Sequence, residues 1–323
     1  MKICSLLPSG TEIVFALGLG DQVIGVTDIC DYPAEATKKR VISRSLVDPA
    51  HLSSAEVERR MQEILRAGKS PFVLDADWLQ AEKPDLILTQ DLCFICDVDA
   101  SEVLDASRLL NPRPQILILS PKTLYDIFEN IKRVGEAAGA MARAEQLTLE
   151  LQERVSAVAD KAATALHKRR VLSLEGIDPL VAGGHWLPEM KWLAGGRDEL
   201  FSPGCPAQRI GWETVLRYAP EVLVIALCSS SIRRNLREAS WLVRQEAWGE
   251  LPAVEKGEVY VVDHVYYSRP GPRNVKGLEI LAQILHPELF TGMIPPDTVV
   301  KLDPLAAKGC PPEMFGSCFL PYP

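Results

Sequence analysis

Residues 123–166 read TLYDIFENIKRVGEAAGAMARAEQLTLELQERVSAVADKAATAL. Apolar side chains recur at helical spacing within residues 124–134 and 147–162, with charged side chains at many positions between them. This pattern predicts a helix that lies with one face on the body of the protein. Gly135 and Gly139 indicate a bend or a break between two helical segments. We predict a rigid connector between two halves of the chain; a crossover helix inside one large domain is the alternative.

The segments on either side of this connector resemble each other. A strand-like apolar run opens each half, at residues 2–7 and at residues 171–174. Further on, each half has a predicted helix, a proline followed by an acidic residue, and a buried strand, at residues 78–90 and 212–226. A repeat of this length indicates two copies of one α/β lobe rather than a solenoid of short repeats.

We therefore divide the chain into four parts. They are an N-terminal α/β lobe (1–122), the connecting helix (123–168), a C-terminal α/β lobe (169–290) and a C-terminal tail (291–323). The tail is rich in proline and contains Cys310 and Cys318. We expect an extended arm that packs on the body, in which the two cysteines could supply metal ligands or a clasp.

Composition argues against several classes of protein. The formal net charge of -8 argues against a nucleic-acid partner, which needs clustered Lys and Arg. No apolar stretch of the sequence reaches the length needed to span a bilayer. Met1 and Lys2 lead directly into a predicted strand without a secretory signal, which predicts a cytoplasmic location. A sequence that began at a mature N-terminus would indicate the periplasm instead.

Eight cysteines in a cytoplasmic protein suggest thiol or metal chemistry before disulfides. Cys93 and Cys96 form a CxxC pair after a predicted strand, and Cys30 follows a neighbouring strand. These three thiols could hold a metal or act in redox chemistry. The alternative is that they are small buried hydrophobic residues.

Two features of the first half have a local interpretation. Tyr32 and Pro33 follow a predicted strand at residues 23–26, and the ring either faces the ligand or packs the loop. Residues 52–66 have the pattern of a charged amphipathic helix that Ser53 or Ser54 would cap. We interpret that helix as a structural or surface element.

Two loops of the second half carry the more unusual side chains. His185 and Trp186 follow two glycines, which suit a loop that approaches another group closely. Residues 264–273 join a predicted strand to the last helix and combine aromatic rings, a hydroxyl and two guanidinium groups. We predict a site for a large, partly polar ligand, where His185 either ligates a metal or makes ordinary hydrogen bonds.

Four motifs then resemble one family in order along the chain. They are SLLPSGTE at residues 5–12, CDYP at 30–33, KPDLI at 83–87 and SRPGPR at 268–273. The set is similar to the helical-backbone (class III) substrate-binding proteins of ABC importers for vitamin B12 and iron-siderophores, and most similar to the cobalamin-binding branch. The resemblance runs from residue 2 to about Leu289, without the signal peptide of that family.

The resemblance implies an α/β fold of two Rossmann-like lobes joined by one long helix, with a ligand cleft between the lobes. It places Tyr32 against a corrin ring, Gln90 where the family often has a tryptophan, and Ser268 where a corrin binder has an acidic residue. With the loops above, the candidate ligand-binding residues are Pro8, Ser9, Thr11, Tyr32, Gln90, Asp91, Glu175, His185, Trp186, Tyr266, Tyr267, Ser268 and Arg269.

The resemblance also implies a permease partner. Asp77 and Glu213 would correspond to the acidic residues that dock each lobe on the permease. Both begin a predicted helix, where the helix dipole also favours a carboxylate. Their acidic character therefore has a structural explanation as well as a functional one.

We predict a binding protein rather than an enzyme, with cobalamin, another corrinoid or a similar tetrapyrrole-sized metal complex as its ligand. It would act as a carrier, a buffer or a transport-related binder, as a monomer, with no cofactor and an ABC permease as a partner. Three alternatives remain: a thiol-based metal or redox protein using Cys30, Cys93 and Cys96, an iron-siderophore or haem binder, and an interaction subunit with a vestigial cleft. The sequence offers no persuasive nucleophile elbow or Ser-His-acid arrangement for a hydrolase.

Overall fold

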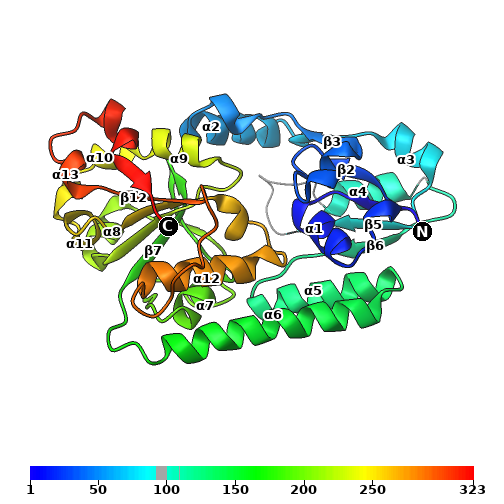
Figure 1. The fold of residues 1–323 in the computed structure, drawn as a ribbon. Helices are drawn as coiled ribbons and strands as arrows, with labels where there is room; N and C mark the ends of the chain where they lie inside the picture. The colour runs from blue at the N-terminus through cyan, green and yellow to red at the C-terminus, as the bar shows by residue number, and fades with distance from the viewer. Residues whose placement is uncertain (92–99, 109) are drawn as a thin grey trace.

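A computed structural model describes residues 1–91, 100–108 and 110–323, which form two α/β lobes side by side (Figure 1). The predicted two-lobed α/β fold with a helical connector is confirmed. Each lobe has one sheet, and the buried strands at the sheet centres are continuous apolar runs. Such runs are typical of parallel strands that are covered by helices on both faces.

The first lobe is built on a six-stranded sheet with the order β4-β3-β2-β1-β5-β6, in which only the β3–β4 pair is antiparallel. Its strands are β1 (Ile3–Ser5), β2 (Val23–Thr27), β3 (Arg40–Ser45), β4 (Phe72–Leu74), β5 (Leu86–Thr89) and β6 (Gln115–Ile118). Its helices are α1 (Pro8–Ala16), α2 (Ser54–Arg66), α3 (Ala76–Glu82) and α4 (Ala100–Ser107), with the 3-10 helices η1 (Gly20–Gln22), η2 (Ala34–Lys38) and η3 (Pro49–His51).

The second lobe is built on a seven-stranded sheet with the order β13-β12-β11-β10-β7-β8-β9. Its strands are β7 (Val171–Ile177), β8 (Leu180–Ala182), β9 (Gln208–Arg209), β10 (Val222–Ile225), β11 (Val259–Val262), β12 (Val299–Leu302) and β13 (Phe319–Pro321). Its helices are α7 (Leu187–Leu193), α8 (Trp212–Tyr218), α9 (Ile232–Glu238), α10 (Ser240–Val243), α11 (Pro252–Glu255), α12 (Arg273–Leu285) and α13 (Pro304–Ala307), with η4 (Trp248–Glu250), η5 (His264–Tyr266) and η6 (Pro312–Cys318). Strands β7, β10 and β11 are parallel, and the outer strands pair antiparallel.

The connector consists of two helices, α5 (Leu124–Ala137) and α6 (Met141–Ala162), which lie side by side (Figure 1). Thr123 caps α5 in a capping box with Asp126. The break expected near Gly135 and Gly139 is a full reversal, so that the two helices are antiparallel. At Gly135 a Cβ atom would lie 2.3 Å from the Cβ of Ala144, so this glycine permits the close approach of the helices.

Helix α6 reaches the hydrophobic cores of both lobes, as α5 does through Leu124 and Phe128. Ala144 and Leu151 near its start pack with the apolar side chains of the first lobe. Val158 and Ala162 near its end pack with those of the second. Because one regular helix is buried at both ends in different cores, it couples the positions of the two lobes.

The C-terminal tail adds two strands to the sheet of the second lobe. Strand β12 pairs antiparallel with β11, and β13 pairs with β12. Phe315 and Phe319 pack in the core of this lobe, with their rings 5.5 Å apart in an edge-to-face contact. The tail is therefore part of the sheet rather than the extended arm that we expected. No helix of the described part of the chain is long and apolar enough to cross a membrane.

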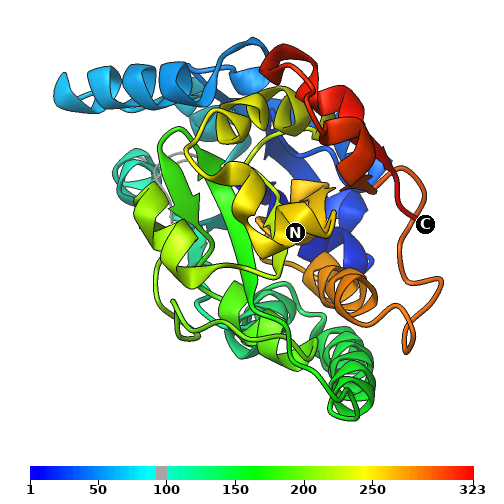
Figure 2. The same ribbon diagram turned by 90° about the vertical axis from the view of Figure 1, so that its left-hand side faces the viewer.

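A second connection crosses between the lobes at residues 48–66, which include α2 and are here called the strap. Figure 1 and Figure 2 both show α2 on the opposite side of the molecule from α6. The Ser54 amide donates to the Glu238 carboxylate at 2.8 Å, and Arg234 donates to the Leu52 carbonyl at 3.2 Å. Glu58 also pairs with Arg209 of the second lobe. The two lobes are thus tied by α6 on one side and by the strap on the other.

Candidate functional site

A cavity of about 880 Å³ lies between the lobes. Its walls come from the loops that follow β1, β2, β3 and β5 in the first lobe and β7, β10 and β11 in the second, together with the strap. The carboxyl ends of parallel strands are the usual ligand-binding edge of open α/β sheets. Pockets for small molecules have volumes of about 300–1,000 Å³, so this cavity is near the large end of that range.

The structure brings together eight of the candidate ligand-binding residues in the lining of this cavity. They are Pro8, Ser9, Gln90, Glu175, His185, Trp186, Ser268 and Arg269. The other five lie outside the lining: Thr11, Tyr32, Asp91, Tyr266 and Tyr267.

Three of these five residues make contacts with other side chains or backbone groups of the protein. Thr11 is completely buried in α1, with its hydroxyl 3.0 Å from the sulfur of Cys30. The guanidinium of Arg273 lies over the ring of Tyr32, 4.0 Å from its centroid. Tyr267 is buried inside the second lobe, where its carbonyl accepts a hydrogen bond from the indole of Trp186.

Trp186 borders the cavity from the core of the second lobe. Its side chain is only 3% exposed, and its Nε1 donates to the Tyr267 carbonyl at 2.7 Å. The ring of His185 stacks beside it with a centroid distance of 5.6 Å. Gly184 is required just before them, because a Cβ there would lie 2.4 Å from the carbonyl carbon of Pro206. The expected close approach of this glycine loop is therefore present.

Arg269 joins the two lobes at the floor of the cavity. Its guanidinium pairs with both carboxylate oxygens of Asp31, one of them at 3.0 Å, and also donates to the Ile29 carbonyl. Burial alone would raise the pKa of Asp31, but the hydrogen bonds and charge of Arg269, with help from Arg273, hold that pKa below its usual range. Asp31 therefore stays ionised at neutral pH.

A second inter-lobe ion pair lies behind the first. The Arg273 side chain donates to Glu12 at 2.7 Å, and the Arg273 amide donates to the same carboxylate at 2.8 Å. Glu12 is 2% exposed, and burial raises the pKa of its carboxyl against the opposing effect of Arg273. These contacts fix the start of α12 against α1.

His264 lies beside these pairs and is buried in an uncharged form. Burial, and then the positive charge of Arg269, lower its pKa to about 3. Its Nδ1 is 2.7 Å from the hydroxyl of Ser268, which lines the cavity. A neutral imidazole suits this position because Arg269 and Arg273 already supply positive charge there.

We expect this histidine to make the protein less stable in mild acid. A histidine in the unfolded chain takes up a proton below about pH 6.5, whereas folded His264 does not, so stability falls as the pH drops from about 6.5 towards 3. Between pH 7 and pH 5 its contribution to the free energy of unfolding should fall by about 2 kcal/mol. We expect the free energy of unfolding, measured with urea, to fall less between pH 7 and pH 5 in His264→Gln than in the wild type. His51 is exposed, so His51→Gln is the control. If the free energy of unfolding of His264→Gln fell by as much as that of the wild type, the expectation would be wrong.

The strap supplies lining residues that the sequence analysis did not select. Val57 and Met61 on one face of α2, with Ser54, Glu58 and Asp48, line the cavity. The apolar face of α2 was a visible signal, but the pattern of a helix does not say what its face contacts. The capping box of Ser53 with Glu56 confirms the predicted cap.

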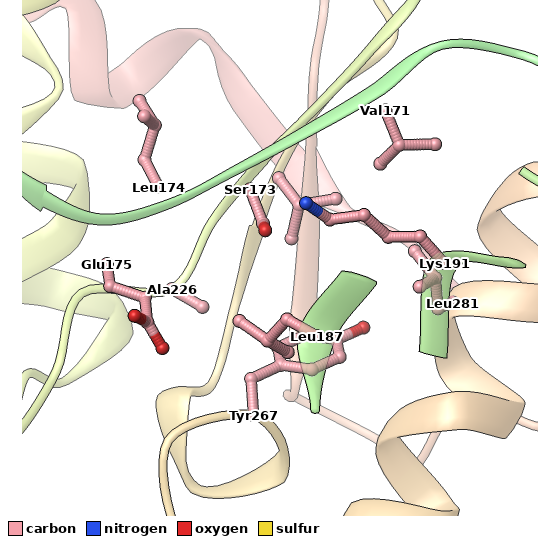
Figure 3. A pocket seen from close by; sticks show the side chains of 10 residues that line it. Val171, Ser173, Leu174, Glu175, Leu187, Lys191, Ala226, Tyr267 and Leu281 are labelled. Atoms are coloured by element: carbon pink, nitrogen blue, oxygen red, sulfur yellow. The ribbon is translucent and has the colours of Figure 1, made fainter. Parts of the chain in front are cut away.

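A second, much smaller cavity of about 10 Å³ lies inside the second lobe (Figure 3). Ser173, Lys191 and Tyr267 line it among apolar side chains, and Glu175 lies between it and the inter-lobe cavity. Its volume is about that of one water probe, so it is too small for any larger ligand.

The predicted thiol cluster falls mostly outside the described residues. Cys93 and Cys96 are not among them, and Cys30 is buried beside Thr11. Within the described ranges, no group of three His, Cys, Asp or Glu side chains is placed to hold a metal ion. The two permease-docking candidates are exposed in the first turns of α3 and α8, one on each lobe: Asp77 and Glu213.

Comparisons with known proteins match this architecture. Residues 3–266 match the family model described as periplasmic binding protein. A substrate-binding lipoprotein of an ABC transporter from Bacillus subtilis, YvrC, is 25% identical over 90% of this chain and 81% of its own length. The vitamin B12-binding protein of Vibrio parahaemolyticus is 23% identical over 86% of each chain.

Solved structures give the same result for the fold. The periplasmic vitamin B12-binding protein BtuF of Vibrio cholerae has a TM-score of 0.63 and 21% identity, covering 88% of this chain and 96% of its own. The periplasmic haem-binding protein RhuT of Roseiflexus has a TM-score of 0.67 and 21% identity, covering 88% and 98%. The predicted cytoplasmic location is wrong, because these relatives are lipoproteins or periplasmic proteins and point to a location outside the cytoplasm.

Proposed function

The chain belongs to the periplasmic binding protein family, and from that premise we propose that it binds cobalamin or a related corrinoid in the inter-lobe cavity. The observation that carries the proposal is the cavity of about 880 Å³ with loops of both lobes around it. A corrinoid is a large, flat, amide-bearing metal complex, which needs both a broad cavity and polar groups on several sides. Haem is the competing ligand, because structural neighbours include haem-binding proteins.

In this proposal Trp186 provides a flat apolar surface for the ligand, and Ser9, Gln90, Ser268 and Arg269 provide polar contacts around it. Burial of apolar surface would contribute about 25 cal/mol per Å², before the costs of ordering and association are subtracted. Tyr32, Thr11, Asp91, Tyr266 and Tyr267 remain predicted site residues without a place in the lining.

We further propose that the protein delivers its ligand to an ABC permease and catalyses no reaction on it. Relatives of the chain are substrate-binding components of transporters. Asp77 and Glu213 are exposed on different lobes and would each meet the permease. We also propose that the lobes, the connector and the tail are divided after residues 122, 168 and 290. No cofactor of the protein itself takes part; the metal arrives with the ligand.

The test is a titration of the purified protein with hydroxocobalamin and cobinamide, with haem for comparison, followed by visible absorption and calorimetry. We expect one-to-one corrinoid binding of micromolar or tighter affinity. Arg269→Ala should weaken it, because that change removes a lining side chain and its pair with Asp31. Arg217→Ala, an exposed change on α8, is the matched control. Failure to bind any corrinoid would refute the proposed function.

A further inference from the structure

The lining of the inter-lobe cavity is strongly acidic. Its seven carboxylates come from both lobes and the strap: Asp28, Asp31, Asp48, Glu58, Glu175, Asp178 and Asp263. Its basic side chains, within the described residues, are the three arginines Arg209, Arg234 and Arg269.

Each of these arginines already has a partner within the protein. Arg209 pairs with Glu58, and Arg269 pairs with Asp31. Arg234 donates from Nε to the Leu52 carbonyl at 3.2 Å. Burial lowers the pKa of Arg234, and the nearby Glu238 carboxylate opposes that effect. A carboxylate on a ligand would therefore have to compete with existing contacts for positive charge.

The two histidines of the lining add little positive charge. Burial lowers the pKa of His264 to about 3, so its ring is neutral. Burial, and then the charge of Lys122, lower the pKa of His185 from its usual value. Among the described residues, the lining thus has four more carboxylic acid side chains than arginines.

A separate observation indicates that a polar ligand group belongs here. Ser230 lines the cavity and is 1% exposed, and its hydroxyl has no hydrogen-bond partner within the described residues. A buried polar group without a partner costs free energy, which a ligand group could recover. An amide can donate to or accept from this hydroxyl, and its N–H groups can also donate to neighbouring carboxylates.

We propose that the cavity selects corrinoids with amide side chains and rejects tetrapyrroles that carry free carboxylates. The inference rests on the proposed function and adds the basis of its specificity. Carboxylates of a ligand would face carboxylates of the lining across the cavity, where like charges repel each other. Amides carry no charge and supply N–H donors, so they meet the same acidic lining favourably.

The test compares two corrinoids of the same ring system, dicyanocobinamide and dicyanocobyrinic acid. The first has amide side chains and the second has carboxylates at the corresponding positions. We expect cobinamide to bind at least about tenfold more tightly at low salt, and the difference to shrink as salt is added. Haem, with its two propionates, should also bind more weakly than cobinamide.

A double variant locates the effect in the lining. Asp28→Asn with Asp178→Asn replaces one lining aspartate in each lobe. We expect it to reduce the ratio of the cobinamide affinity to the cobyrinic acid affinity about threefold or more. The control double variant, Glu145→Gln with Asp160→Asn, removes two exposed charges on α6 and should leave the ratio unchanged. Circular dichroism and thermal unfolding check that both proteins are folded.

The outcomes separate the two proposals. The charge selection would be wrong if cobyrinic acid or haem bound as tightly as cobinamide or more tightly. It would also be wrong if the control double variant changed the ratio of the two corrinoid affinities as much as Asp28→Asn with Asp178→Asn. The protein would still be a binding protein in either case. Binding of none of these corrinoids would refute the proposed function, and the inference with it.

Discussion

Lys191→Met should lower the free energy of unfolding by about 3–5 kcal/mol, the usual cost of removing one partner from a buried ion pair. The Lys191 ammonium lies 2.6 Å from the Asp198 carboxylate, and both side chains are 1% exposed. The variant would leave the buried Asp198 carboxyl group without its cation, and the amides of Leu200 and Phe201 would be its remaining donors among the described residues. Urea or guanidinium unfolding measures the loss.

A second substitution should relieve this loss. Lys191→Met with Asp198→Asn removes the unpaired charge, and the asparagine oxygen can still accept from the two amides. The double variant should therefore be more stable than Lys191→Met alone. Arg59→Met breaks an exposed pair with Glu63 and should cost less than about 1 kcal/mol. The role of the buried ion pair would be contradicted if Lys191→Met cost less than about 1 kcal/mol. It would also be contradicted if the double variant were as unstable as Lys191→Met.

Trp186→Ala should have the largest combined effect on stability and binding. Truncation of a buried aromatic side chain costs about 3–5 kcal/mol of unfolding free energy. The variant also removes a lining side chain of the cavity and the donor to the Tyr267 carbonyl. We expect corrinoid affinity to fall about tenfold or more, as for aromatic residues at the centre of an interface. Calorimetric titration at a temperature where the variant is folded gives the affinity.

Two other tryptophan variants complete this test. Trp186→Phe keeps an apolar ring without the N–H group, and should fall between the wild type and Trp186→Ala in stability and affinity. Trp192→Ala truncates a side chain that is 48% exposed on α7 and should leave binding unchanged. If Trp186→Ala bound corrinoids as tightly as the Trp192→Ala control, Trp186 would have no part in the ligand site.

Local structure was predictable where neighbouring residues decide it. The three apolar residues that begin β5 and the four of β10 follow a proline and an acidic residue, and the structure has strands there. The capping box of Thr123 with Asp126, which begins α5, needs only three residues of spacing. The glycine loop before Trp186 makes the close backbone contact that its composition indicated.

Contacts between distant segments could not be obtained in the same way. Gly135 and Gly139 indicated a break, but the reversal of α6 onto α5 depends on packing that the pattern does not encode. The ring of Tyr32 meets Arg273 from the other lobe, and no local feature predicts that pairing. The strap contacts residues more than 150 positions away in the chain, at Arg209 and Glu238.

The tail is an intermediate case. The apolar residues Val299, Val300 and Leu302 form a short strand-like run. The frequent prolines around it favoured an irregular arm, because proline cannot donate to a strand ladder. The structure has a strand of four residues, β12, and a strand of three, β13, which includes Pro321 and lies at the edge of the sheet, where proline is tolerated.

The strap has a thermodynamic consequence for any ligand of the cavity. With α6 on one side and the strap on the other, the lobes already hold their relative positions, so the site is preorganised. Much of the entropy that a hinged receptor loses when it closes on its ligand has been lost during folding instead. A larger share of the contact free energy can then appear as affinity, because less of it is consumed in ordering the receptor.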